Sequence, residues 1–156
     1  MGIHQLYFSC KLPIDIEIAW KFFSDPKNLS KITPPGMNFR IRSKIEKAET
    51  YEGQMIAYKV SPLLGIPMTW LTEITHVKAP HYFVDEQRKG PYSIWHHEHE
   101  FIAIPGGIEM IDRLTYEVPF CPFGEILNSL FIENKIQEIF THRKVVLEKM
   151  FGNFKK

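Results

Sequence analysis

A single long amphipathic segment at the C-terminal end of the sequence limits the folds that this chain can adopt. From about Glu125 to Phe151, apolar residues recur at helical spacing, which predicts a helix of about seven turns. Its apolar stripe comprises Ile132, Ile136, Ile139, Phe140, Leu147 and Met150. Arg143 falls within the same stripe, so its guanidinium should face the core. The rest of the fold has to be built around this one helix.

The residues before this helix show the pattern of antiparallel strands joined by hairpins. Runs of alternating polar and apolar residues are separated by Pro and Gly turn signals. Two short helices are expected after the first strand, one at 15–23 with Asp15 as a candidate cap and one that starts at Pro26 with Asp25 as its cap. The expected strands are 3–12, 37–46, 55–60, 68–76, 82–88, a strand ending at Phe101, and 108–119.

This order of elements predicts an α+β fold. A curved antiparallel sheet covers its apolar face with a second sheet or with a helix. Because only one long helix is expected, we predict a seven-stranded curved antiparallel sheet wrapped around it, with the two short helices closing one end. The sequence contains no linker, repeat or low-complexity segment, so residues 1–156 should form one domain. The space between sheet and helix is the natural place for a ligand cavity.

Two strands joined by a turn at Gly90-Pro91 carry polar side chains toward the expected core. Alternate side chains of a strand share a face. His97 and His99 should therefore point inward together with two aromatic residues, Trp95 and Phe101, whereas His96 should point outward. On the preceding strand, Asp85 and Gln87 should share the inner face in the same way.

Polar groups collected in a protein interior are costly unless they bond one another or a ligand. The sequence therefore predicts a polar-lined cavity. Further inward candidates come from the strand at 68–76, from the last strand and from the C-terminal helix. The full set of expected cavity residues is Trp70, Thr72, Asp85, Gln87, Trp95, His97, His99, Asp112, Tyr116 and Arg143. A buried guanidinium needs an anion, so we expect Arg143 to pair with Asp85 or Asp112.

Three chemical interpretations of these inward residues stand beside a purely structural one, in which they only satisfy one another. His97 and His99, with Asp85 or Asp112 as third ligand, could hold a metal ion. A His held by an Asp could act as a general base. A few fixed polar groups on an apolar, aromatic wall could bind a small molecule. The composition and motifs favour the last interpretation over an enzyme, and an enzyme over a metal site.

The overall composition excludes several classes of partner. The chain has 156 residues, 44% of them hydrophobic and 24% charged, with a net charge of +1, so a nucleic-acid partner is not expected. No segment approaches the ~20 apolar residues of a membrane span. The two cysteines, Cys10 and Cys121, lack metal-ligand spacing, and we expect buried thiols in a reducing compartment, which predicts a cytoplasmic protein. The oligomeric state is left open.

The motifs along the chain also resemble a known superfamily. They comprise Trp70-Leu-Thr72-Glu-Ile74, Phe83-Val-Asp85-Glu-Gln87, Gly90-Pro91-Tyr92, Trp95-His-His97-Glu-His99-Glu-Phe101, Met110-Ile-Asp112, Tyr116-Glu-Val-Pro119 and Ile139-Phe-Thr-His-Arg143. With the order of elements, they resemble the START-like helix-grip superfamily, also called SRPBCC, over essentially the whole chain. The superfamily includes polyketide cyclases, lipid-transfer domains and pollen-allergen-like proteins. The motifs look most like an uncharacterised bacterial branch whose members are sometimes called cell-division inhibitors.

The resemblance implies a fold and a cavity, and it does not imply one activity. We therefore expect a protein that binds or carries a small hydrophobic or amphipathic molecule, with no cofactor, no metal ion and no insertion into membranes. The alternative is a small cofactor-independent enzyme of the cyclase, dehydratase or hydrolase type that uses the inward His and Asp residues as acid and base.

Overall fold

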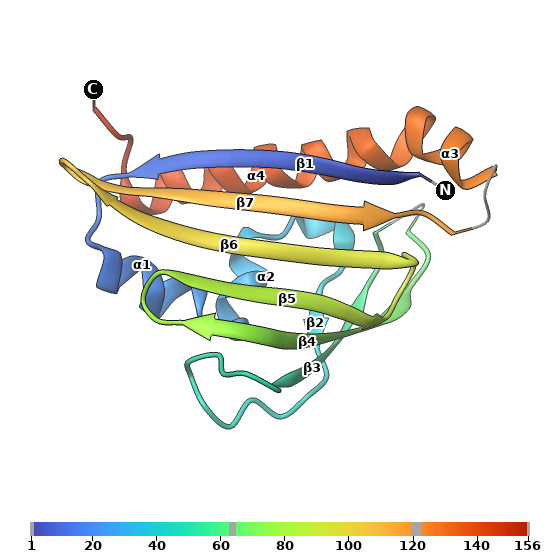
Figure 1. Cartoon of the computed structure of the whole chain (residues 1–156), viewed down its shortest axis with the longest axis horizontal. Helices are drawn as coiled ribbons and strands as arrows, with labels where there is room; N and C mark the ends of the chain where they lie inside the picture. The colour runs from blue at the N-terminus through green and yellow to red at the C-terminus, as the bar shows by residue number, and fades with distance from the viewer. Residues whose placement is uncertain (1, 63–64, 120–122, 156) are drawn as a thin grey trace.

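The computed structural model describes residues 2–62, 65–119 and 123–155 (Figure 1). Within them, seven strands form one antiparallel sheet in the order β1-β7-β6-β5-β4-β3-β2. The strands are β1 Ile3–Leu12, β2 Arg40–Ile41, β3 Met55–Val60, β4 Met68–Lys78, β5 Tyr82–Lys89, β6 Ile94–Ile104 and β7 Gly107–Glu117. The predicted α+β class and the predicted seven-stranded sheet are confirmed.

The helical elements lie on one side of this sheet. They are α1 Ile16–Phe23, the 3-10 turn η1 Pro26–Asn28, α2 Leu29–Ile32, the 3-10 turn η2 Pro35–Met37, α3 Phe123–Leu127, the π-helical turn η3 Asn128–Ile132, and α4 Glu133–Phe151. Figure 1 shows α4 running along β1 and β7, with α1 and α2 behind the lower strands. The sheet therefore curves around the C-terminal helix, as predicted.

The start of the chain follows the sequence prediction closely. The side chain of Asp25 accepts a hydrogen bond of 3.0 Å from the Lys27 N–H, so it caps the turn that begins at Pro26. Asp15 occupies the N-cap position of α1, but its side chain makes no capping hydrogen bond there. The position of the first helix was therefore predicted correctly, whereas the capping role of Asp15 was wrong.

The expected strand at 37–46 is wrong in length, since only Arg40 and Ile41 pair with β3. Before them, Asn38 adopts a left-handed conformation with φ of 49°, which bends the chain. After them, the Ser43 hydroxyl accepts a hydrogen bond of 2.6 Å from the Ala57 N–H. A side chain thus takes the position of a backbone partner in the ladder, and regular pairing stops.

The C-terminal helix is interrupted where the sequence predicted one regular helix from about Glu125. A π-helical turn, Asn128–Ile132, separates α3 from α4. On α4, the residues buried against the rest of the protein are Ile136, Phe140, Arg143 and Leu147. Met150 is 45% exposed, so its predicted place in the apolar stripe is wrong. The remainder of the stripe packs on the sheet, with the Phe140 ring stacked on the Phe8 ring at a centroid distance of 3.9 Å.

Two remaining expectations concern membranes and thiols. Among the helices of the described residues, none is both long and apolar enough to cross a membrane. Cys10 is a buried free thiol, and its burial raises the pKa to about 11. Cys121 lies outside the described residues, so the prediction for it stays a prediction.

Candidate functional site

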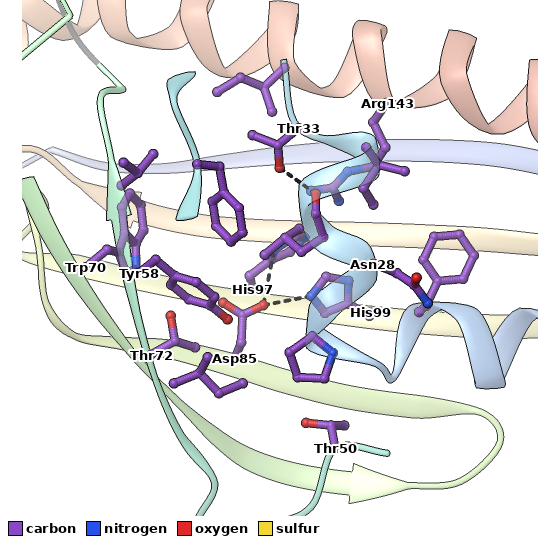
Figure 2. A pocket seen from close by; sticks show the side chains of 18 of the residues that line it. Asn28, Thr33, Thr50, Tyr58, Trp70, Thr72, Asp85, His97, His99 and Arg143 are labelled. Atoms are coloured by element: carbon purple, nitrogen blue, oxygen red, sulfur yellow. Dashed lines mark hydrogen bonds and ion pairs between the residues drawn. The ribbon is translucent and has the colours of Figure 1, made fainter. Parts of the chain in front are cut away.

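A cavity of about 180 Å³ lies between the sheet, the short N-terminal helices and α4. Figure 2 shows the side chains that surround it. Its wall is mostly apolar and comes from α1 to α2, from strands β3 to β6 and from α4. A few polar side chains interrupt this wall, and most of the charged ones gather on β5, β6 and α4.

One part of the wall is an aromatic cluster from three neighbouring segments. The rings of Trp70 and Trp95 meet edge to face at a centroid distance of 5.0 Å. The Tyr92 ring lies 4.7 Å from the Trp95 ring and 5.6 Å from the Trp70 ring. Such tilted and edge-to-face contacts are the preferred geometries of aromatic pairs. They create a rigid apolar surface beside the polar part of the cavity.

The polar part consists of Asp85, His97, His99, Asp112 and Arg143, which we call the polar cluster. Strand register brings its members together, because Asp85 pairs with His97 across β5 and β6, and His99 pairs with Asp112 across β6 and β7. Alternation along β6 then directs both imidazoles to the inner face. His97 is 4% exposed and Asp112 is 2% exposed. The prediction that both His side chains point inward is confirmed.

Each carboxylate of the cluster contacts both imidazoles. Asp112 Oδ1 lies 2.9 Å from His97 Nε2 and 2.9 Å from His99 Nδ1. Asp85 Oδ1 lies 2.7 Å from His99 Nε2 and 3.4 Å from His97 Nδ1. Figure 2 shows Asp85 directed toward the two rings from the cavity side. All four imidazole nitrogens therefore have a carboxylate oxygen within ion-pair distance.

Arg143 approaches the cluster from α4. One of its terminal nitrogens lies 3.5 Å from Asp112 Oδ1, so the predicted pairing of this guanidinium with an inward Asp is confirmed. The guanidinium carbon also lies 4.6 Å from the centroid of the Phe140 ring, in a cation–π contact. Its Nε is buried and has no hydrogen-bond partner among the residues that the structure describes. Arg143 lines the cavity and retains capacity to donate a hydrogen bond.

These contacts determine the protonation of the cluster. Burial alone would lower the pKa of His97, but the hydrogen bonds to Asp112 and Asp85 outweigh it and raise the pKa to about 9. Burial alone would raise the pKa of Asp85 and of Asp112, but hydrogen bonds from His97 and His99 hold both values well below their usual range. The Arg143 charge contributes to the low pKa of Asp112. The cluster thus contains ionised carboxylates and a protonated His97 at neutral pH.

Seven of the ten expected cavity residues line the cavity: Trp70, Thr72, Asp85, Trp95, His97, His99 and Arg143. The other three lie outside its lining. Gln87 accepts from the Tyr92 N–H and donates to the Tyr92 carbonyl, so it holds the turn between β5 and β6. Asp112 lies behind the two imidazoles, and the Tyr116 hydroxyl donates a 2.9 Å hydrogen bond to Asn128. These three residues do not line the cavity, because a shared strand face does not establish access to it, and their part in ligand binding stays a prediction.

The sequence analysis missed several lining residues. Tyr58 lines the cavity from β3, where alternation with two buried neighbours, Ile56 and Val60, carried a usable signal. Ser24 and Asn28 line it from the end of α1 and from η1. For these two, no sequence signal was available, because the way in which short helices close over a sheet is decided by tertiary packing.

Comparisons with known proteins support this architecture. No family model matches the sequence, and no curated protein matches it either. Among solved structures, a START superfamily protein from Mycobacterium smegmatis superposes with a TM-score of 0.71 at 12% identity, over 95% of this chain and 97% of that chain. A protein from Thermus thermophilus gives 0.66 at 17% identity, over 94% and 95% of the two chains. Ara h 8.0201 gives 0.60 at 15% identity, over 95% and 99%.

The chain therefore has the START-like, or SRPBCC, helix-grip fold that the sequence motifs suggested. Sequence identities below 20% establish the fold alone. The resemblance to one bacterial branch, and the boundary of a single domain at residues 1–156, stay predictions.

Proposed function

We propose that this protein binds or carries a small amphipathic molecule within the cavity between the sheet and α4. The observation that carries the proposal is a mostly apolar cavity with a compact polar cluster on one wall. Ligand sites typically combine apolar walls with a few fixed polar groups in this manner. The START-like fold adds support, because the superfamily that the sequence motifs resemble includes lipid-transfer domains.

The size of the cavity narrows the class of ligand. A volume of about 180 Å³ is close to the ~150 Å³ of engineered apolar cavities that take up benzene. A molecule with one aromatic ring or a short branched chain matches this volume, whereas a diacyl lipid is far larger. The surrounding Trp70, Tyr92 and Trp95 rings supply the apolar face that such a ring would stack on.

The polar end of the ligand should carry a hydrogen-bond acceptor. Arg143 lines the cavity, and its buried Nε has no hydrogen-bond partner within the described part of the chain. A buried donor without a partner costs about 1–3 kcal/mol. A ligand carboxylate or hydroxyl oxygen that draws the Arg143 guanidinium toward the cavity and accepts from its N–H groups would recover that cost. An aromatic acid is therefore the preferred class within the proposal.

The alternative of acid–base catalysis has weaker support. A general base must be unprotonated at the working pH. The pKa of His97 is raised to about 9, and both of its ring nitrogens already face carboxylates. We therefore place binding before catalysis.

The test is a titration of the full chain with three ring compounds that differ only in their polar end: toluene, benzyl alcohol and benzoate. Calorimetry and the fluorescence of Trp70 and Trp95 report binding. We expect benzoate to bind most tightly, and Arg143→Met to weaken benzoate about tenfold or more while leaving toluene little changed. If no ring compound binds, and native mass spectrometry of the protein from its natural source finds no co-purifying small molecule, the proposal is wrong.

A matched pair of helix variants tests the location. Ile139 lines the cavity from α4, whereas Val145 lies on the same helix and is exposed. Ile139→Phe should fill part of the cavity and weaken binding, and Val145→Phe should leave binding unchanged. Equal effects of the two substitutions would place the ligand elsewhere.

A further inference from the structure

We propose that Asp85, His97 and His99 form a site for one divalent transition-metal ion, of the zinc and iron(II) class, on the cavity wall. One donor atom of each residue lies within 4.8 Å of the others. All three residues line the cavity, so an ion held there would be reachable from the ligand space. Two imidazoles and one carboxylate are a donor set that such ions use in proteins.

The two distances from Asp85 to the imidazole nitrogens are close to those between the ligands of an ion of this size. Zinc takes nitrogen and carboxylate oxygen ligands at about 2.0–2.2 Å, so two ligands in a tetrahedral arrangement lie about 3.3–3.5 Å apart. Asp85 Oδ1 is 3.4 Å from His97 Nδ1 and 2.7 Å from His99 Nε2. The first distance already matches, and the second needs to open by less than 1 Å through a rotation of side chains.

The second observation is the support that Asp112 gives to both imidazoles. It faces His97 Nε2 and His99 Nδ1, each at 2.9 Å, which are the nitrogens that point away from Asp85. A metal-bound imidazole typically donates its other N–H to a carboxylate, which orients the ring and selects the tautomer. Here the buried Asp112 carboxylate accepts a hydrogen bond from each of the two rings.

Tautomer chemistry then directs the free donor atoms to one point. A neutral imidazole has one N–H and one lone pair. A bound ion would displace the second proton of His97. With the remaining N–H groups of His97 and His99 pointing to Asp112, both lone pairs then point to the side of Asp85. Two lone pairs and a carboxylate oxygen then converge, an arrangement that a cation stabilises. The Arg143 charge, 3.5 Å from Asp112, offsets the negative charge behind the rings.

The proposed site has the form of an open metal centre. Three protein ligands leave at least one coordination position, as in metal sites that also bind an exchangeable molecule. The cavity adjoins the three ligands, so that position would face the ligand space. Metal binding itself does not depend on the proposed small-molecule ligand, and each can be tested without the other.

The experiment uses the full chain after treatment with a chelator and its removal. Calorimetric titration with Zn²⁺ should give one site per chain with a dissociation constant of about 10 µM or tighter. Titration with Co²⁺ should give visible absorption bands of a four- or five-coordinate ion. Asp85→Asn and His99→Gln should each weaken binding by about 100-fold or more, and Asp112→Asn by about 10- to 100-fold.

His96 provides the matched control, because it lies between the two proposed ligands on β6 and contacts Glu86 on the opposite face. His96→Gln should leave Zn²⁺ affinity and the Co²⁺ spectrum unchanged. If near-ultraviolet circular dichroism shows that the cluster variants do not fold, X-ray absorption of the zinc-loaded wild-type protein tests whether histidine side chains ligate the ion. Two imidazoles in the first coordination sphere support the site.

Two results would overturn the proposal: no Zn²⁺ binding up to about 100 µM, or binding that Asp85→Asn and His99→Gln leave intact. The benzoate titration, run with a chelator present, keeps the two proposals separate. Benzoate binding without metal binding would remove only the metal site. Metal binding with neither a bound ring compound nor a co-purifying small molecule would remove only the proposed carrier function.

Discussion

Two regions of this molecule reverse the usual relation between polarity and burial. The polar cluster on β5, β6, β7 and α4 is buried, with Arg143 only 8% exposed. The start of the C-terminal helical segment is apolar and exposed, with Phe123 at 70% and Phe131 at 62%. We call the second region the apolar helix start; it comprises Phe123, Ile126, Leu127, Leu130 and Phe131.

The comparison shows that the number of partners, and not polarity alone, sets what a side chain contributes to the fold. Every carboxylate, imidazole and guanidinium of the polar cluster lies within 4.0 Å of an opposite charge or of a hydrogen-bonding partner. Such a cluster is costly to break, since each removal strands a buried charge. The apolar helix start leaves much of its surface in water, so its side chains add little to stability. The predictions below test this difference.

The largest effect should come from removing Asp112, which contacts three members of the polar cluster. Asp112→Ala strands the charges of His97 and Arg143 and should lower the free energy of unfolding by about 3–5 kcal/mol. Arg113→Ala is the control, because the neighbouring Arg113 side chain is 44% exposed and pairs with Glu100 on the outer face. It should cost less than about 1 kcal/mol. Urea unfolding of both variants measures the difference, and similar losses would contradict our interpretation.

A double-mutant cycle should show that Arg143 and Asp112 act as a unit. We expect the effects of Arg143→Met and Asp112→Asn on unfolding free energy to differ from additivity by about 1–3 kcal/mol, because their charged groups lie 3.5 Å apart in a buried site. Strictly additive effects would mean that the ion pair contributes nothing. The same cycle with Asp85 would then show whether Arg143 is coupled to the other carboxylate.

The polar cluster should also make stability depend on pH in both directions. The pKa values of Asp85 and Asp112 are lowered in the folded protein, so their contribution is present above about pH 4 and is lost as the pH falls below it. The pKa of His97 is raised from 6.5 to about 9, so its contribution is complete below pH 6.5 and is lost as the pH rises through 9.

Thermal unfolding of the chelator-treated protein from pH 3 to pH 10 measures this dependence. We expect maximum stability between about pH 4 and 6.5. His97→Gln should flatten the alkaline limb and leave much of the acid limb in place. A wild-type profile that stays level between pH 6.5 and 9 would show that His97 is not held protonated by the two carboxylates.

The smallest effect should come from the apolar helix start. Phe131→Ser replaces a large side chain that is 62% exposed, so it should change the free energy of unfolding by about 0.5 kcal/mol or less. Phe140→Ser, on the buried side of the same helical segment, is the contrast and should cost about 3–5 kcal/mol. A large loss for Phe131→Ser would mean that this region is covered in solution.

The sequence predicted those parts of the fold that depend on local periodicity. Alternation on β6 identified the inward faces of His97 and His99, and helical spacing placed Arg143 among buried residues on α4. Hairpin signals identified the succession of β2 to β7 along the chain, and they carried no information on the pairing of β1 with β7. These properties follow from the geometry of one strand or one helix, so they are present in the chain before it folds.

Where the tertiary structure decided the outcome, the signal was not local. Gln87 and Tyr116 share strand faces with cavity residues, but they do not line the cavity. Gln87 hydrogen-bonds to Tyr92 and Tyr116 to Asn128 instead. The strand expected at 37–46 ended early because the Ser43 hydroxyl found a backbone partner on β3.

The arrangement of the polar cluster belongs to the same category. The sequence by itself determined that Asp85, His97, His99, Asp112 and Arg143 point inward. Only the pairing of three strands and the docking of α4 decided that Asp112 lies behind the rings while Asp85 faces the cavity. Periodicity specifies the direction of a side chain, whereas contacts between distant segments specify which groups it meets.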